Sequence, residues 1–225
     1  MGDRPERVIT VFAPKGGVGK TTIATSLLAA ARLEGIDAAG VDLDAQASLT
    51  TWAEIRARQG RTPQIRTLAA SPAEWPEVRR AEARRQLLVV DTPPGLDDDE
   101  RLAAVRILLR DSDLVLIPAQ PYAATLLKLA DMGVALRSRD GSRAVFVLNQ
   151  VIAGRAVLRE AREWLAQRGA ELCPVEIPLR DHVARTMGLG LAAVEFDDSQ
   201  GGAAQMRTLW RFAASRLGFL AAEAA

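Results

Sequence analysis

A glycine-rich loop between an apolar run and a helix-forming run carries the strongest chemical signal in the sequence. The run Val8–Ala13 leads into Pro14-Lys-Gly-Gly-Val-Gly-Lys-Thr-Thr22, and the helix-forming stretch starts at Lys20. Glycines let consecutive backbone N–H groups turn inward around phosphate oxygens, and the positive end of a helix dipole favours the same anion. We expect Lys20 to bridge the β- and γ-phosphates of ATP and the Thr21 hydroxyl to ligate Mg²⁺. The expected nucleotide contacts are Gly16, Gly17, Val18, Gly19, Lys20, Thr21 and Thr22.

Three aspartates follow apolar runs and could reach the same phosphates. Asp42 and Asp44 lie at the end of the run 38–43, and alternate residues of a strand share one face. Capping of the next helix, expected over 48–59, is the alternative role for this pair. Asp91 follows the continuous apolar run 87–90, which is the pattern of a Walker B strand that delivers one carboxylate to the neighbourhood of the metal.

An amide follows a later strand. Asn149 comes directly after the run 144–148. An amide at a strand end near the nucleotide can hydrogen-bond the adenine edge, so Asn149 is a candidate base contact. The alternative is a residue that only makes the turn after the strand.

The elements that must position these residues alternate along the chain. We expect strands at 8–13, 38–43, 65–69, 87–90, 114–117, 144–148 and 172–177. Helices are expected at 20–34, 48–59, within 73–85, 98–110, 123–139, 156–168, within 180–187 and 205–222. Several strands are apolar on both faces, so the pattern predicts an α/β fold with a mostly parallel central sheet and helices on both faces. Ligands of such sheets bind at the carboxyl ends of the strands, where the motifs fall.

Composition narrows the class of protein. The chain has 225 residues, which is one domain, and 29 basic against 28 acidic residues give a net charge of +1. One cysteine and one histidine exclude an intramolecular disulfide and make a Cys- or His-rich metal site improbable. No apolar run reaches the ~20 residues of a membrane span, and the polar start has no secretory signal, so we expect a cytoplasmic protein.

The glycine-rich loop departs from the ordinary P-loop pattern. Pro14 stands where that pattern has glycine, and Lys15 adds a second lysine. Two of the three lysines of this arginine-rich chain therefore lie in one loop. The form K-G-G-x-G-K-[ST], together with Asp-x-Asp at 42–44 and Asp-x-Pro-Pro at 91–94, resembles the ParA/MinD family of deviant Walker ATPases. The resemblance implies a parallel α/β P-loop fold that forms ATP-sandwich dimers.

The resemblance also implies roles for single residues. Lys15 would reach the phosphates bound by the other subunit and, with Lys20, stabilise charge during hydrolysis. Asp44 would position the attacking water, and Asp42 would support Mg²⁺ through its water shell. Pro178 would lie against the base. The chain departs from the family pattern at Ala45, where the family has proline, and in the arginine after Pro178, which comes one residue later.

The resemblance covers 8 to about 217 and is strongest to small plasmid-partition ParA proteins. Because the P-loop begins by residue 14, we expect one P-loop ATPase domain over 1–225, with no separate N-terminal helix-turn-helix domain. Operator-specific repression is therefore not expected.

The main functional hypothesis is a DNA-segregation ATPase. An ATP-bound homodimer would bind DNA without sequence preference, associate with the nucleoid and position a plasmid, chromosome or other cargo. A ParB-like centromere-binding protein or a cargo adaptor would stimulate its weak Mg²⁺-dependent hydrolysis. The candidate DNA contacts cluster around the last helices, and solvated arginines balanced by nearby acids are the alternative reading; they are Arg180, Arg185, Arg207 and Arg211.

Two other classes of function remain open. A MinD-like membrane ATPase needs an amphipathic C-terminal anchor, and 206–220 has apolar and basic residues at helical spacing. A terminal helix packed on the sheet through Leu209, Trp210, Ala213 and Leu217 explains the same spacing. A metabolic relative is the third class, but a single cysteine disfavours an iron–sulfur dimer and no further motif suggests a synthetase.

Overall fold

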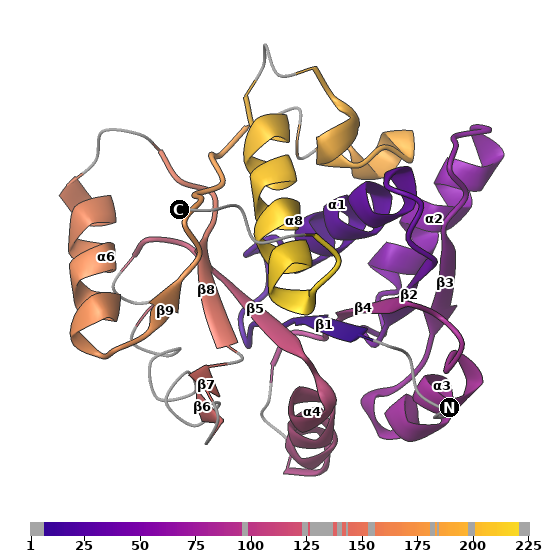
Figure 1. The fold of residues 1–225 in the computed structure, drawn as a ribbon, viewed down its shortest axis with the longest axis horizontal. Helices are drawn as coiled ribbons and strands as arrows, with labels where there is room; N and C mark the ends of the chain where they lie inside the picture. Colours follow the sequence, from indigo (N-terminus) through magenta and orange to yellow (C-terminus); the bar gives the residue numbers. More distant parts are fainter. Residues whose placement is uncertain are drawn as a thin grey trace.

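Seven parallel strands form the central sheet, in the order β3-β2-β4-β1-β5-β8-β9 (Figure 1). The computed structural model describes residues 7–95, 99–122, 126, 137–138, 141–142, 144–152, 156–180, 183, 185–197 and 201–220. The strands are β1 (Arg7–Val11), β2 (Ala38–Asp42), β3 (Arg66–Ala69), β4 (Leu87–Asp91), β5 (Leu114–Ala119), β8 (Ala144–Leu148) and β9 (Glu171–Leu172). A separate antiparallel hairpin joins β6 (Arg137–Ser138) and β7 (Gly141–Ser142).

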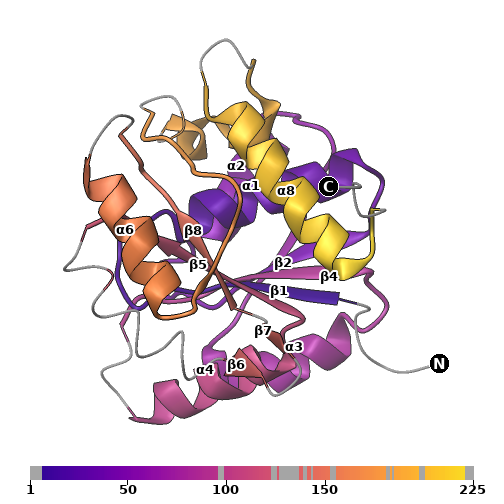
Figure 2. The same ribbon diagram turned by 60° about the vertical axis from the view of Figure 1, so that its left-hand side comes forward.

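Helices cover both faces of the sheet, which confirms the predicted α/β class. The α-helices are α1 (Lys20–Leu33), α2 (Ser48–Arg58), α3 (Trp75–Ala81), α4 (Asp99–Asp111), α6 (Ala156–Gln167) and α8 (Ala203–Leu217). The 3-10 turns within the described residues are η1 (Pro72–Glu74), η2 (Met187–Leu189) and η3 (Ala193–Glu195). Figure 2 shows α1, α2 and α8 on one side of the sheet and α3 and α4 on the other.

Alternation along the strands explains why both faces are covered. In β1, Ile9 and Val11 pack into the cluster of α1 and α8, whereas Val8 packs into the opposite cluster with Trp75 of α3. Strands β2, β4, β5 and β8 are buried at every residue. Because both faces bury apolar side chains, the hydrophobic effect selects a three-layer arrangement.

Most predicted elements are confirmed to within a few residues, but the last strand is shorter than predicted. The expected strand 172–177 is only Glu171–Leu172, followed by a single bridge between Val151 and Pro178. Pro174 lies inside the expected strand and has no N–H to donate to a neighbour, which accounts for the early end. The expected helix 123–139 lies mostly outside the described residues, and 137–138 belong to β6 instead.

The apolar face of α8 packs into the hydrophobic core. Leu209, Trp210, Ala213 and Leu217 are all buried in the cluster that α8 shares with α1 and the sheet. This confirms the prediction that the 206–220 stretch contains a helix packed on the sheet, although the helix itself spans Ala203–Leu217. Among the described residues, no helix is both long enough and apolar enough to span a membrane.

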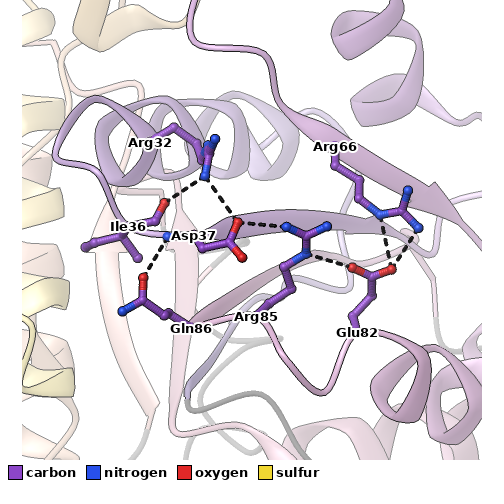
Figure 3. A network of polar contacts seen from close by, with 7 residues as sticks. All are labelled: Arg32, Ile36, Asp37, Arg66, Glu82, Arg85 and Gln86. Atoms are coloured by element: carbon purple, nitrogen blue, oxygen red, sulfur yellow. Dashed lines mark hydrogen bonds and ion pairs between the residues drawn. The ribbon is translucent and has the colours of Figure 1, made fainter.

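Charged side chains connect α1, β2, β3 and α3 at the amino ends of the strands (Figure 3). The Asp37 Oδ1 accepts from Arg32 at 3.2 Å and from Arg85 at 2.7 Å. Arg85 also donates to Glu82 Oε2 at 3.0 Å, and Arg66 donates to Glu82 Oε1 at 2.8 Å. Burial alone would raise the pKa of Glu82, but the hydrogen bonds and charges of Arg66 and Arg85 outweigh it and hold that pKa below its usual range.

We expect Glu82→Gln to lower the free energy of unfolding at pH 7 by about 1–2 kcal/mol, because two guanidinium groups lose their buried charged acceptor. A carboxyl with a lowered folded-state pKa stabilises the fold above its unfolded pKa and loses that effect as the pH falls through the folded value. The difference from wild type should therefore shrink below pH 4 in urea unfolding. Glu77→Gln, in an exposed pair with Arg80, is the control and should change stability little.

Candidate nucleotide-binding site

The glycine-rich loop leaves the N-terminus of α1 open to a ligand. Gly17 has φ 74° and Gly19 has φ 90°, which is left-handed backbone that favours glycine. Gly19 is the N-cap of α1, and no side chain there caps the helix by a hydrogen bond. The first-turn N–H groups of α1 are therefore suited to an anion.

Lys20 is a largely buried cation inside this loop. The residue is 7% exposed, and its Nζ donates to the Lys15 carbonyl at 3.2 Å. Burial lowers the pKa of Lys20, while the charges of Asp91 and Asp44 act to raise it. A largely buried ammonium at the first residue of a helix can balance the charge of a phosphate, which fits the predicted role.

Asp91 and Thr21 form the second half of the site. The Thr21 hydroxyl donates to Asp91 Oδ2 at 2.6 Å, and Asp91 Oδ1 is buried with no hydrogen-bond partner. Burial raises the pKa of Asp91 to about 7, against the Thr21 hydrogen bond that lowers it. A buried carboxylate oxygen without a partner next to a hydroxyl fits Mg²⁺ or one of its waters, because this ion takes oxygen ligands and keeps several waters.

The two alternating carboxylates of β2 have different surroundings. Asp42 is fully buried, and it accepts from the Thr50 N–H at 2.9 Å and from the Asp44 N–H at 3.2 Å. It thus satisfies the third N–H of α2, so the helix-cap alternative holds for this residue. Burial raises the pKa of Asp42, and the two backbone hydrogen bonds lower it. Support of a metal by Asp42 stays a prediction.

Asp44 lies at the rim of the same site. It is partly exposed, and its Oδ1 accepts from the Gln46 N–H at 3.0 Å. Its charge acts on both Lys20 and Asp91. The register of the sheet explains this proximity, because β2 and β4 are neighbours and Asp42 pairs with Asp91.

The segment after Asp91 holds the loop from the other side. The buried Thr92 hydroxyl donates to the Val11 carbonyl at 3.0 Å, and the Gly95 N–H donates to the Pro14 carbonyl at 2.7 Å. The Thr92 bond ties the segment 92–95 to the end of β1, and the Gly95 bond joins it to the first residue of the loop.

Two amide side chains that follow β8 contact the loop, and one that follows β5 contacts the second of them. Asn149 is 4% exposed, and its Nδ2 donates to the Val18 carbonyl at 2.7 Å. Gln150 Nε2 donates to the Gly17 carbonyl at 2.8 Å, and Gln120 donates to Gln150. The Asn149 contact with adenine stays a prediction, and one of its amide hydrogens is used by the loop. Sequence reasoning missed the glutamines, whose only signal is that they follow strands. Pro178 is half-buried and bridges to Val151.

The structure separates the candidate DNA arginines into two kinds. Arg180, Arg185 and Arg211 are exposed, and Arg180 lies beside Gly201 at the start of α8. Arg207 is half-buried and donates to the carbonyls of Val194 and Phe196. Arg207 therefore ties α8 to η3, which is a structural role that its sequence position did not indicate.

Known proteins match this chain in sequence and in fold. Residues 9–192 match the family described as the CobQ/CobB/MinD/ParA nucleotide binding domain. The maintenance of carboxysome distribution protein A of Gloeobacter kilaueensis is 34% identical over 172 residues, which are 72% of this chain and 72% of that protein.

Two solved structures show the fold. The septum site-determining protein MinD of Pyrococcus horikoshii, complexed with Mg-ADP, superposes with a TM-score of 0.74 at 19% identity and covers 96% of this chain and 99% of its own. A structure from Borrelia burgdorferi, described as a plasmid partition protein bound to AMPPNP, has a TM-score of 0.70 at 17% identity and covers 94% and 100%. With the family match and the 34% identical relative, these likenesses confirm the resemblance read from the motifs: the chain belongs to the ParA/MinD family of nucleotide-binding domains.

Proposed function

We propose that this protein is a Mg²⁺-dependent ATPase whose ATP-bound form is a homodimer. The observation that carries the proposal is the buried, unpartnered Asp91 Oδ1 beside the Thr21 hydroxyl, with the buried Lys20 charge close by. A site with one unpaired carboxylate oxygen, one hydroxyl and one ammonium matches a phosphate–metal pair and no apolar ligand.

Each residue of the site would have one task. The loop N–H groups and Lys20 bind the β- and γ-phosphates, Thr21 and Asp91 hold the oxygen ligands of the metal, and Asp44 orients the attacking water from the rim. Mg²⁺, when bound, neutralises charge that develops on the phosphoryl oxygens. Asp42 keeps the Asp44 backbone in place through the 3.2 Å hydrogen bond.

The proposal of a dimer is based on Lys15. Its side chain is exposed on the loop, while its carbonyl accepts from Lys20. An exposed second lysine on the loop can reach phosphates held by the facing subunit and stabilise the charge of the transition state.

The cargo hypothesis combines the family with the exposed arginines. We propose that the dimer binds nucleoid DNA without sequence preference through Arg180, Arg185 and Arg211, and that a ParB-like or adaptor partner stimulates hydrolysis. The 34% identical relative is named for carboxysome distribution, and the Borrelia structure is described as a plasmid partition protein. Both names support a function in distributing a large cargo within the cell.

The test uses Asp44→Ala, which we expect to bind ATP without hydrolysing it. With ATP and Mg²⁺ this variant should elute as a dimer and shift long duplex DNA of unrelated sequences, with an affinity that falls with salt on a slope of about −0.9 per phosphate contacted. Adding Arg185→Ala and Arg211→Ala should flatten the slope and leave the dimer intact. Arg80→Ala, on the opposite side of the sheet, is the control.

Two results would contradict parts of this proposal. A monomeric Asp44→Ala protein in ATP and Mg²⁺ would exclude the sandwich dimer. Co-sedimentation with anionic liposomes, without a DNA shift, would replace DNA binding with the membrane alternative.

A further inference from the structure

Two amide side chains donate hydrogen bonds to carbonyl groups of the glycine-rich loop. Gln150 Nε2 donates to the Gly17 carbonyl at 2.8 Å, and Asn149 Nδ2 donates to the Val18 carbonyl at 2.7 Å. The fit of the second is close, because a Cβ on Gly19 would lie 2.3 Å from Asn149 Nδ2. Both donors follow β8, more than a hundred residues from the loop in sequence.

Because the peptide group is planar, a hydrogen bond to a loop carbonyl also fixes the direction of the N–H group of the next residue. In a trans peptide the C=O of one residue and the N–H of the next point in opposite directions and turn as one rigid unit. A donor that holds the Gly17 carbonyl outward therefore fixes the direction of the Val18 N–H. In the same way, a donor on the Val18 carbonyl fixes the Gly19 N–H. These N–H groups belong to the loop that would hold the phosphates.

Gln150 adopts a rare backbone conformation while making this contact. Its φ is 57°, which is left-handed backbone, and among the described residues Ala47 is the other non-glycine with positive φ. Residues other than glycine rarely adopt this backbone region, and those held in it are concentrated at functional sites. The backbone strain at Gln150 is consistent with a functional role for its side-chain amide, which contacts the loop.

Gln120 completes the chain of amides. It follows β5, the neighbour of β8 in the sheet, and its Nε2 donates to Gln150 Oε1. This bond leaves the Gln150 Nε2 directed to Gly17, because an amide that accepts through its oxygen on one side presents its N–H₂ on the other. Hydrogen bonds in such a chain also polarise one another.

We propose that Gln150, oriented by Gln120, is a positioning residue that aims the Val18 N–H at the phosphates of the bound nucleotide. This inference rests on the proposed binding of ATP in the loop. It assigns to the ends of β5 and β8 a share of the phosphate affinity, although neither glutamine would touch the nucleotide.

The test separates binding from folding. Gln150→Gly removes the amide and also relieves the left-handed strain, so the free energy of unfolding should stay the same or rise. The affinity for ATP–Mg²⁺ and for ADP, measured by calorimetric titration, should fall about tenfold, because a charged acceptor loses one preorganised donor. Ala47→Gly relieves comparable strain away from these carbonyls and serves as the stability reference.

A second variant tests the chain of amides. Gln120→Ala should weaken nucleotide binding less than Gln150→Gly does, by about threefold, since Gln150 keeps its own bond to the loop. The double variant should bind no more weakly than Gln150→Gly alone, because Gln120 acts only through Gln150. Fully additive losses would show that Gln120 acts by another route and would overturn its part of the proposal.

Other outcomes are equally decisive. Unchanged affinity in Gln150→Gly would overturn the positioning role, and a loss of affinity together with a loss of stability would make Gln150 a structural residue only. Wild-type protein that binds neither nucleotide would refute the proposed function itself, and the inference with it. That result is distinct from a wild type that binds and a variant that binds equally well.

Discussion

Replacing Lys20 with alanine is expected to weaken ATP binding by about 100-fold or more, because the phosphates lose the charged donor inside the loop. The ammonium is largely buried and lies within the field of Asp91 and Asp44, so no exposed side chain can take its place at that point. The variant should remain folded, since burial already disfavours the charged form of Lys20 and lowers its pKa. Calorimetric titration with ATP and Mg²⁺, next to urea unfolding, measures both effects.

Lys15→Ala is the matched control, with the same residue type removed from the exposed side of the same loop. It should bind ATP within about threefold of wild type and fail to form the ATP-dependent dimer or show partner-stimulated turnover. If both lysine variants lose nucleotide affinity equally, Lys15 acts within its own subunit, and the proposed contact with the facing subunit is wrong.

Asp91→Asn is expected to stabilise the nucleotide-free protein while it abolishes ATP hydrolysis. The pKa of Asp91 is about 7 in the fold, above its ordinary value of 3.8. The folded state therefore retains a proton that the unfolded chain releases, and the free energy of unfolding falls as the pH rises from about 4 to 7. At pH 8 the neutral amide should raise this free energy by roughly 1–3 kcal/mol, after allowance for one unpaired amide N–H.

The pH dependence of the stability gain distinguishes loss of a buried charge from a change in packing. The gain in stability should be largest above pH 7 and shrink as the pH falls, and it should be smallest below 3.8, where the wild-type carboxyl becomes neutral in both states. In nucleotide titrations, added Mg²⁺ should no longer increase the affinity of the variant for ATP. An equal gain at pH 4 and pH 8 would contradict the ionisation explanation, and an undiminished effect of Mg²⁺ would contradict the assignment of Asp91 to the metal.

Local sequence determined the phosphate loop and the fold class. The glycines at 16, 17 and 19 and the lysine at 20 act within one turn of chain, so their spacing specifies the loop without reference to the rest of the molecule. Apolar runs alternate with amphipathic stretches, and that local pattern was enough to predict a parallel sheet covered on both faces. The early end of β9 was missed because one proline outweighed the apolar run around it.

Tertiary structure decided what surrounds the loop. The alternation of Asp42 and Asp44 predicted that both would face the phosphates, but only the position of α2 made Asp42 a cap for that helix. Gln150 contacts the loop and Gln120 contacts Gln150, because β5 and β8 are neighbours and end at the same edge of the sheet.

The arginines also show what sequence alone could predict and what required the tertiary structure. Four arginines near the C-terminus looked alike in sequence, yet Arg207 donates to backbone carbonyls while Arg211 is exposed. Arg56 is fully buried and forms an ion pair with Glu195 at 2.8 Å, 139 positions away. Sequence spacing determines which residues share a face of one element. The partner of a charged side chain depends on which elements pack together, and this is decided by burial of apolar surface over the whole chain.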